Sequence, residues 1–156
     1  MVQKQNPEVE SSVITTQEEI ILKKQGEAID AYFAKHKLPL EGYGLKFATE
    51  AKKNEIDWRL LPAIAMREST GGKHACKKVE NSVFGYGSCK MGFESIDKSI
   101  EIVSRSLGGN HPGTAHYYDG KTTLEILRKY NSVIPNYPNQ VVKIMNNINQ
   151  DSEVKI

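Results

Sequence analysis

Glu68 is the residue of this chain whose position best suits acid–base chemistry. It ends an apolar segment, IDWRLLPAIAMRES, and is followed closely by Gly71 and Gly72. A carboxyl group on the last turn of a buried helix is poorly solvated, and the negative end of the helix dipole also disfavours its charged form. A carboxylic acid that keeps its proton near neutral pH can protonate a glycosidic oxygen. The alternative is an ordinary surface glutamate at a frayed helix end.

Aromatic and amide residues follow Glu68 in a defined order. The segment Asn81–Gly87 reads NSVFGYG, and Phe93–Ser95 reads FES. Tyr130 and Asn131 come next, and Tyr137 opens the last amphipathic segment. In this order the motifs resemble those of the lysozyme-like superfamily of peptidoglycan-cleaving glycosidases.

The resemblance extends from Gly42 to Ile148. A Glu-Ser pair ends a core helix in these enzymes and carries the general acid. The Asn-x-Phe-Gly and Phe-x-Ser motifs resemble the N-acetylglucosaminidases of flagellar, autolytic and phage hydrolases, and Tyr130-Asn131 resembles the Tyr-Asn motif of lytic transglycosylases. Two departures leave open which bond is cut. Phe84–Gly87 replaces the Gly-Leu-Met-Gln loop of many transglycosylases, and the Tyr130 region lacks the usual Tyr-Ala-Thr-Asp of the glucosaminidases.

The resemblance implies a glycosidase that cleaves β-1,4 bonds between N-acetylglucosamine and N-acetylmuramic acid with a single catalytic glutamate. Glu68 would be the general acid, and Tyr130 would position a water molecule or the substrate's N-acetyl group. Tyr130 has the alternative role of a core aromatic residue. Three other functions remain open: a lytic transglycosylase that forms anhydro-muramyl products, an inactive cell-wall-binding domain, and an unrelated helical interaction module.

Five residues are candidates for substrate binding. Aromatic faces stack on sugar rings, and glycines allow close approach of the backbone. Phe84 has the alternative of a core residue, Ser69 that of a plain helix residue, and Asn131 that of a helix-ending residue. The candidates are Ser69, Phe84, Tyr86, Asn131 and Tyr137.

Cys76 and Cys89 are the two cysteines of the chain and flank the Asn81–Gly87 motif. A bond between them would close a small loop beside Glu68 and contribute about 3 kcal/mol of stability. The alternative is a pair of free thiols in a reducing compartment. The histidines are dispersed and have no metal-ligand spacing, so we expect neither a metal nor a cofactor.

Composition and charge restrict the class of protein and its partners. The chain has 156 residues, 38% hydrophobic and 26% charged, which is typical of a single globular domain. A net charge of +2 without a Lys/Arg run argues against nucleic acid, although it is compatible with an anionic polymer. No segment has the length of a membrane span, and Met1–Ser12 is too polar for a signal peptide.

From these features we expect a monomer whose partner is the glycan strands of peptidoglycan. It would act outside the cytoplasm or in the cell wall, reached through an export segment absent from this sequence or by phage delivery.

The apolar periodicity predicts a mainly α fold, a lysozyme-like helical domain with a long active-site loop and at most a small β-hairpin between Lys77 and Met91. Gly26 is expected to interrupt the first helix. We expect a disordered lead over 1–16, a helical extension over 17–41, the glycosidase domain over 42–149 and a disordered tail over 150–156. The predicted helices are Gln17–Lys37, Gly44–Asn54, Asp57–Ser69, one that Ser95 opens, Thr122–Asn131 and Pro138–Asn149.

Overall fold

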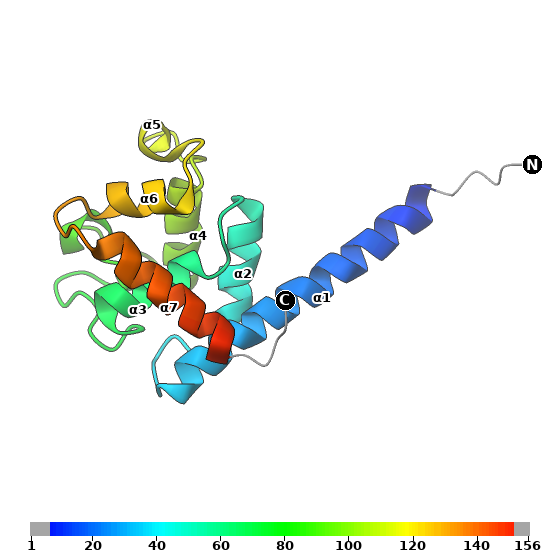
Figure 1. Cartoon of the computed structure of the whole chain (residues 1–156), viewed down its shortest axis with the longest axis horizontal. Helices are drawn as coiled ribbons and strands as arrows, with labels where there is room; N and C mark the ends of the chain where they lie inside the picture. The colour runs from blue at the N-terminus through cyan, green and yellow to red at the C-terminus, as the bar shows by residue number, and fades with distance from the viewer. Residues whose placement is uncertain (1–6, 152–156) are drawn as a thin grey trace, which may run out of the picture.

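All regular secondary structure is helical in the part of the chain that the computed structural model describes, residues 7–151 for the backbone and 16–149 for the side chains (Figure 1). No strand occurs there, so the mainly α prediction is confirmed. Seven α-helices and a short 3₁₀ helix follow in chain order: α1 (Pro7–Lys35), α2 (Gly44–Lys53), α3 (Leu60–Ser69), η1 (Tyr86–Cys89), α4 (Ile96–Leu107), α5 (Ala115–Tyr118), α6 (Thr123–Tyr130) and α7 (Tyr137–Asp151).

The first helix begins earlier than the sequence predicted. Helix α1 starts at Pro7, so it includes most of the 1–16 lead that was expected to be disordered. Proline is favoured at the first position of a helix, and neither glycine nor proline recurs before Gly26. Residues 1–6 of that lead, and all of the predicted tail beyond Asp151, lie outside the described residues.

Gly26 does not interrupt α1, contrary to the prediction, but forms its crossing point with α2. A Cβ atom added to Gly44 would lie 2.0 Å from the Gly26 carbonyl oxygen, so the two backbones touch. The Asp30 carboxylate fixes the same crossing because its Oδ1 accepts hydrogen bonds from the backbone N–H groups of Gly42 and Gly44, each at 2.8 Å. The glycine therefore allows close packing that any larger residue would prevent.

Helix α3 forms the centre of the core. A helix that is apolar on all sides has to be enclosed by others, and α3 packs against α7 and α2 while α1 packs against both α2 and α7. All residues of α3 from Leu60 to Ala65 are buried. The rigid surroundings of this segment fix the position of the last turn of α3, which carries Glu68.

Two helix starts confirm their sequence signals. The Ser95 side chain accepts a hydrogen bond from the backbone N–H of Lys98 at the start of α4. At α6 the Thr122 hydroxyl and the Glu125 carboxylate form both bonds of a capping box. Asp57, the first residue of the helix predicted over Asp57–Ser69, instead lies before α3 and binds the backbone N–H and the guanidinium of Arg59.

The long segment between α3 and α4 contains no hairpin. Its central part, η1, is a compact turn in which Gly87, Ser88 and Cys89 have φ angles of 67°, 56° and 60°. Left-handed backbone cannot continue a strand, which is why the hairpin considered for this loop does not form. The loop between α4 and α6 is likewise not entirely irregular, since it includes the single turn α5.

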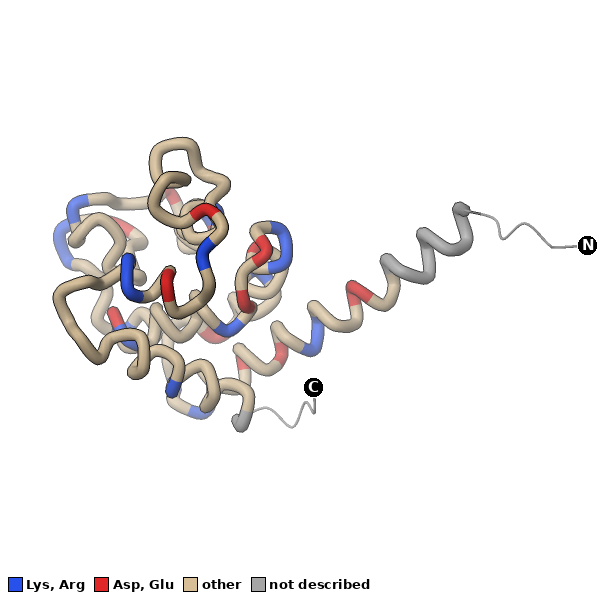
Figure 2. The backbone as a smooth tube through the Cα atoms, turned by 45° about the horizontal axis from the view of Figure 1, so that its top comes forward, with Lys and Arg blue, Asp and Glu red and all other residues tan. Residues whose placement is uncertain are grey.

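Charged residues of both signs are distributed over the whole fold. Figure 2 shows acidic and basic positions interspersed along the chain rather than gathered on separate halves. Within the described residues, none of the helices combines the length and the apolar character that crossing a bilayer requires.

Candidate active site

Glu68 lies on the last turn of α3, where the helix ends in left-handed backbone. Thr70 has φ 51° and ψ 53°, and Gly71 follows with φ 62°. The N–H groups of Thr70 and Gly71 bind the carbonyls of Met66 and Ala65, at 3.0 and 3.2 Å, so the helix end is closed by its own backbone. The Glu68 side chain is half-buried. The chain reversal leaves it at the edge of the core.

Ser69, a predicted substrate-binding residue, is instead buried in the wall behind the site. Its side chain is 3% exposed and cannot reach a ligand in solution. Its Oγ lies 2.6 Å from the Val83 carbonyl oxygen and 3.0 Å from the Gly72 nitrogen. Ser69 thus connects the last turn of α3 to Gly72, just after the helix, and to Val83, farther along the same loop.

Gly85 lies directly against the Glu68 carboxylate. A Cβ atom on Gly85 would be 2.7 Å from Glu68 Oε2, closer than any real side chain could be. The φ angle of Gly85 is 63°, in the left-handed region that favours glycine. Both space and backbone conformation therefore demand glycine at this position.

Tyr137, at the start of α7, holds the other oxygen of the same carboxylate. Its hydroxyl donates a hydrogen bond to Glu68 Oε1 at 2.7 Å, and its ring is fully buried. Burial, together with the hydrogen bond to Glu68, raises the pKa of Tyr137, so the phenol stays protonated as a donor. The predicted substrate contact of Tyr137 is replaced by this internal contact, because no ring surface is exposed.

Tyr130 and Phe84 form a second tie beside the first. The Tyr130 hydroxyl donates to the backbone carbonyl of Phe84 rather than to Glu68. Its ring is stacked on Tyr137, with centroids 6.3 Å apart and planes 15° from parallel. Burial, then the proximity of Tyr137 and Glu68, raises the pKa of Tyr130. Phe84 is 0% exposed, so it is a core residue and not the predicted sugar platform.

Tyr86 and Asn131 lie at the borders of the site, and the structure gives their polar groups internal partners. The Tyr86 hydroxyl is 3.2 Å from Ser106 Oγ on α4, and its ring packs beside Phe93. Asn131 Oδ1 accepts from the backbone N–H groups of Val133 and Ile134, at 3.1 and 3.2 Å. Of the two, Asn131 also lines the cleft described next.

A cleft of about 550 Å³ opens over the Glu68 carboxylate. Glu68 is the one carboxylate in its lining, and neither Glu94 nor Asp119 contributes to it. Three lining residues, Ser132, Val133 and Ile134, follow α6 and belong to no sequence motif. The hydrogen bonds that Asn131 Oδ1 accepts from the backbone form the turn that places them at the cleft. The lining comprises Glu68, Gly85, Ser88, Cys89, Tyr130, Asn131, Ser132, Val133 and Ile134.

Cys76 and Cys89 form a disulfide, as the sequence suggested, with Cα atoms 5.6 Å apart. Cys89 belongs to the cleft wall, and Cys76 also donates its backbone N–H to the Ser82 carbonyl. The covalent bond therefore ties the left-handed turn of η1 to the segment that leaves α3. In the described part of the chain no three His, Cys, Asp or Glu residues are grouped to hold a metal ion.

Changing both cysteines to serine is expected to lower the unfolding free energy by about 3 kcal/mol, because the loop between them becomes free in the unfolded chain. For a domain of this size the melting temperature would fall by about 6–12 °C. Calorimetry with and without dithiothreitol measures the effect. The reductant should destabilise the wild type and leave the Cys76→Ser/Cys89→Ser variant unchanged, and a wild type insensitive to reductant would contradict the prediction.

The geometry thus provides one carboxylate on the lining of a cleft, held at Oε1 by a protonated phenol and with Oε2 next to Gly85. Such a group can give and take a proton. Searches of family models, of curated proteins and of solved structures found no match to this chain.

Proposed function

We propose that this protein is a peptidoglycan glycosidase that cleaves β-1,4 bonds between N-acetylglucosamine and N-acetylmuramic acid, with Glu68 as its general acid. The observation that carries the proposal is the fixed Glu68 carboxylate at the cleft. Oε1 accepts the Tyr137 hydroxyl, so Oε2, the oxygen next to Gly85, is the one assigned to proton transfer in this proposal. The motifs around Glu68, with their resemblance to lysozyme-like enzymes, supply the substrate class.

In the proposed reaction the Glu68 acid protonates the glycosidic oxygen as the bond from that oxygen to the sugar C1 breaks. The positive charge that develops at C1 is stabilised by the substrate's own N-acetyl group, since the cleft lining has no second carboxylate. Glu68, now a carboxylate, takes the proton from the water that attacks C1. If a hydroxyl of the same sugar attacks instead, the product is an anhydro ring, as in a transglycosylase.

Tyr130 has a positioning role in this proposal and no proton-transfer step. Its hydroxyl holds the Phe84 carbonyl, and Phe84 precedes the glycine that covers Glu68. The disulfide suits an oxidising environment outside the cytoplasm, where the substrate is found. We infer that the protein acts there as a monomer.

Incubation with purified, insoluble peptidoglycan tests the function directly. Soluble fragments should appear with time, and mass spectrometry of their ends separates hydrolysis, which leaves reducing sugars, from transglycosylation, which leaves anhydro sugars. Sedimentation with the wall and no release of fragments would identify a binding domain. Absence of both release and sedimentation would favour a helical interaction module.

Two tyrosine variants separate the contacts described above. Tyr137→Phe removes the hydrogen bond to the Glu68 carboxyl, and bonds to charged groups contribute about 1.5–3 kcal/mol, so cleavage should slow about 10- to 100-fold. Tyr130→Phe keeps the stacked ring but leaves the Phe84 carbonyl without its donor, so its main effect should be a lower melting temperature. Rates and melting temperatures of both variants are compared. Equal rate losses would contradict the separate roles.

A further inference from the structure

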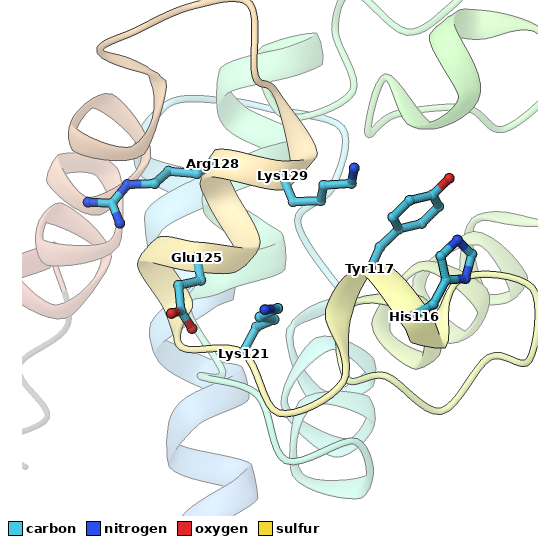
Figure 3. Close-up of a pocket in the computed structure, with 6 residues that line it drawn as sticks. All are labelled: His116, Tyr117, Lys121, Glu125, Arg128 and Lys129. Carbon is cyan, nitrogen blue, oxygen red and sulfur yellow. The ribbon is translucent and has the colours of Figure 1, made fainter.

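A second pocket, distinct from the Glu68 cleft, lies between α5 and α6. It has a volume of about 420 Å³ and is drawn in Figure 3. Its lining is dominated by basic and aromatic side chains: His116, Tyr117, Lys121, Glu125, Arg128 and Lys129.

The positive charge of this pocket is not neutralised within the protein. Among the described residues no ion pair involves Lys121, Arg128 or Lys129. Glu125 is the one carboxylate of the lining, and its Oε2 accepts from the Thr122 backbone N–H at 2.8 Å as part of the capping box. Three cations therefore line the pocket with one carboxylate, which leaves a local excess of positive charge.

Tyr117 gives the pocket an ordered aromatic wall. Tyr117 is 42% exposed, so its side chain is open to solvent and accessible to a ligand. The Lys129 Nζ lies 4.1 Å from the centroid of that ring, and the His116 ring is tilted against it, with centroids 3.8 Å apart and planes 43° from parallel. Figure 3 shows the Lys129 side chain directed toward Tyr117, whereas Arg128 points away from both. The cation–π contact thus places one ammonium group at a defined position.

Helix α6 connects this pocket to the proposed active site. Lys129 lines the basic pocket, and Tyr130, the next residue, lines the Glu68 cleft. The Cα atoms of successive residues are about 3.8 Å apart, so one polymer molecule is long enough to contact both sites.

We propose that the α5–α6 pocket binds oxyanions carried by the polymer whose glycan strand occupies the Glu68 cleft. Resting on the proposed function, this inference adds an anionic subsite to it. The oxyanion is a carboxylate of the peptide side chains of peptidoglycan or a phosphate of a polymer attached to it, because both offer the same charged oxygens to lysine. Contacts of this kind strengthen binding of substrate and transition state alike, so they act on KM and not on kcat.

The test uses Lys121→Gln/Lys129→Gln and, as a matched control, Lys23→Gln/Lys24→Gln, which removes the same charge from exposed positions on α1. The pocket variant should raise KM for soluble peptidoglycan fragments about three- to tenfold with kcat unchanged. The control variant should match the wild type. Kinetics of the pocket variant equal to those of the control would overturn the proposal.

Binding without cleavage is measured by sedimentation of the protein with insoluble walls. Both pairs of lysine changes are placed in a Glu68→Gln background for this experiment. Pocket changes should weaken binding and reduce its dependence on sodium chloride, whether or not the wild type cleaves. The walls are then treated in two separate ways: their carboxylates are amidated, or their phosphates are removed with hydrofluoric acid. The treatment that abolishes the difference in binding between the pocket variant and its parent identifies the anion. If the parent does not bind, or if neither treatment changes the difference, the pocket has no such role. Binding without cleavage by the wild type would instead contradict the proposed function alone.

Discussion

Replacing Glu68 by glutamine is expected to slow peptidoglycan cleavage about 10²- to 10⁴-fold, the range over which general acid catalysis contributes. The amide keeps an oxygen that can accept the Tyr137 hydroxyl, which in the wild type lies 2.7 Å from Oε1. The fold should therefore survive, while the proton that would have been delivered from Oε2 is lost. Release of soluble fragments and the melting temperature are measured on the same preparation.

Glu94→Gln is the matched control for this change. Glu94 is an exposed carboxylate just before α4 and is absent from the cleft lining, so its variant should cleave at the wild-type rate. If Glu68→Gln and Glu94→Gln are equally active, Glu68 is not the general acid. If Glu68→Gln loses activity only in step with a fall in melting temperature, the effect is structural.

Changing Gly85 to alanine is expected to reduce the cleavage rate about 100-fold with only a modest loss of stability. The new Cβ would lie 2.7 Å from Glu68 Oε2, and the cheapest relief is rotation of the flexible carboxylate away from that site. A displacement of about 1 Å at a reacting group can cost about 100-fold in rate. The left-handed φ of 63° adds about 1–2 kcal/mol of backbone strain.

Gly87→Ala provides a control with the same strain and a different neighbour. Gly87 has a φ angle of 67°, but a Cβ there would meet only the Met91 side chain, at 3.4 Å. Both variants should therefore lose similar melting temperature, and Gly85→Ala alone should lose most of its activity. Equal activity of the two variants would show that the contact between Gly85 and Glu68 has no bearing on function.

The elements that could be predicted from the sequence are those whose signals are local. The predicted helix starts at Thr122 and Ser95 are confirmed because each depends on a cap between residues only three positions apart. The all-apolar character of α3 likewise placed it in the core. The prediction for Gly26 was wrong because the role of this glycine is not local. Its lack of a side chain allows contact with Gly44, which lies on another helix.

The same distinction applies to the candidate site. Cys76 and Cys89 were paired correctly because they flank one loop. The partner of Tyr130 could not be predicted, since the acceptor of its hydroxyl is the Phe84 backbone carbonyl, which has no sequence signature. Ser69 and Phe84 were recognised as residues of the site region, but whether they face the ligand or the core depends on how the loop folds over α3.

The crossing of α1 and α2 has a mechanical consequence. Because no side chain separates Gly26 from Gly44, the two backbones are in direct contact there, which restricts movement of α1 against α2. The helix continues outward from the crossing, as Figure 1 shows, and rises about 1.5 Å per residue, so Thr16 lies about 15 Å beyond it. A force on the outer part of α1 is therefore transmitted to α2 through the crossing, which a flexible linker would not do. The outer half of α1 is therefore a rigid helical extension. A group attached to it would keep a fixed orientation relative to the cleft.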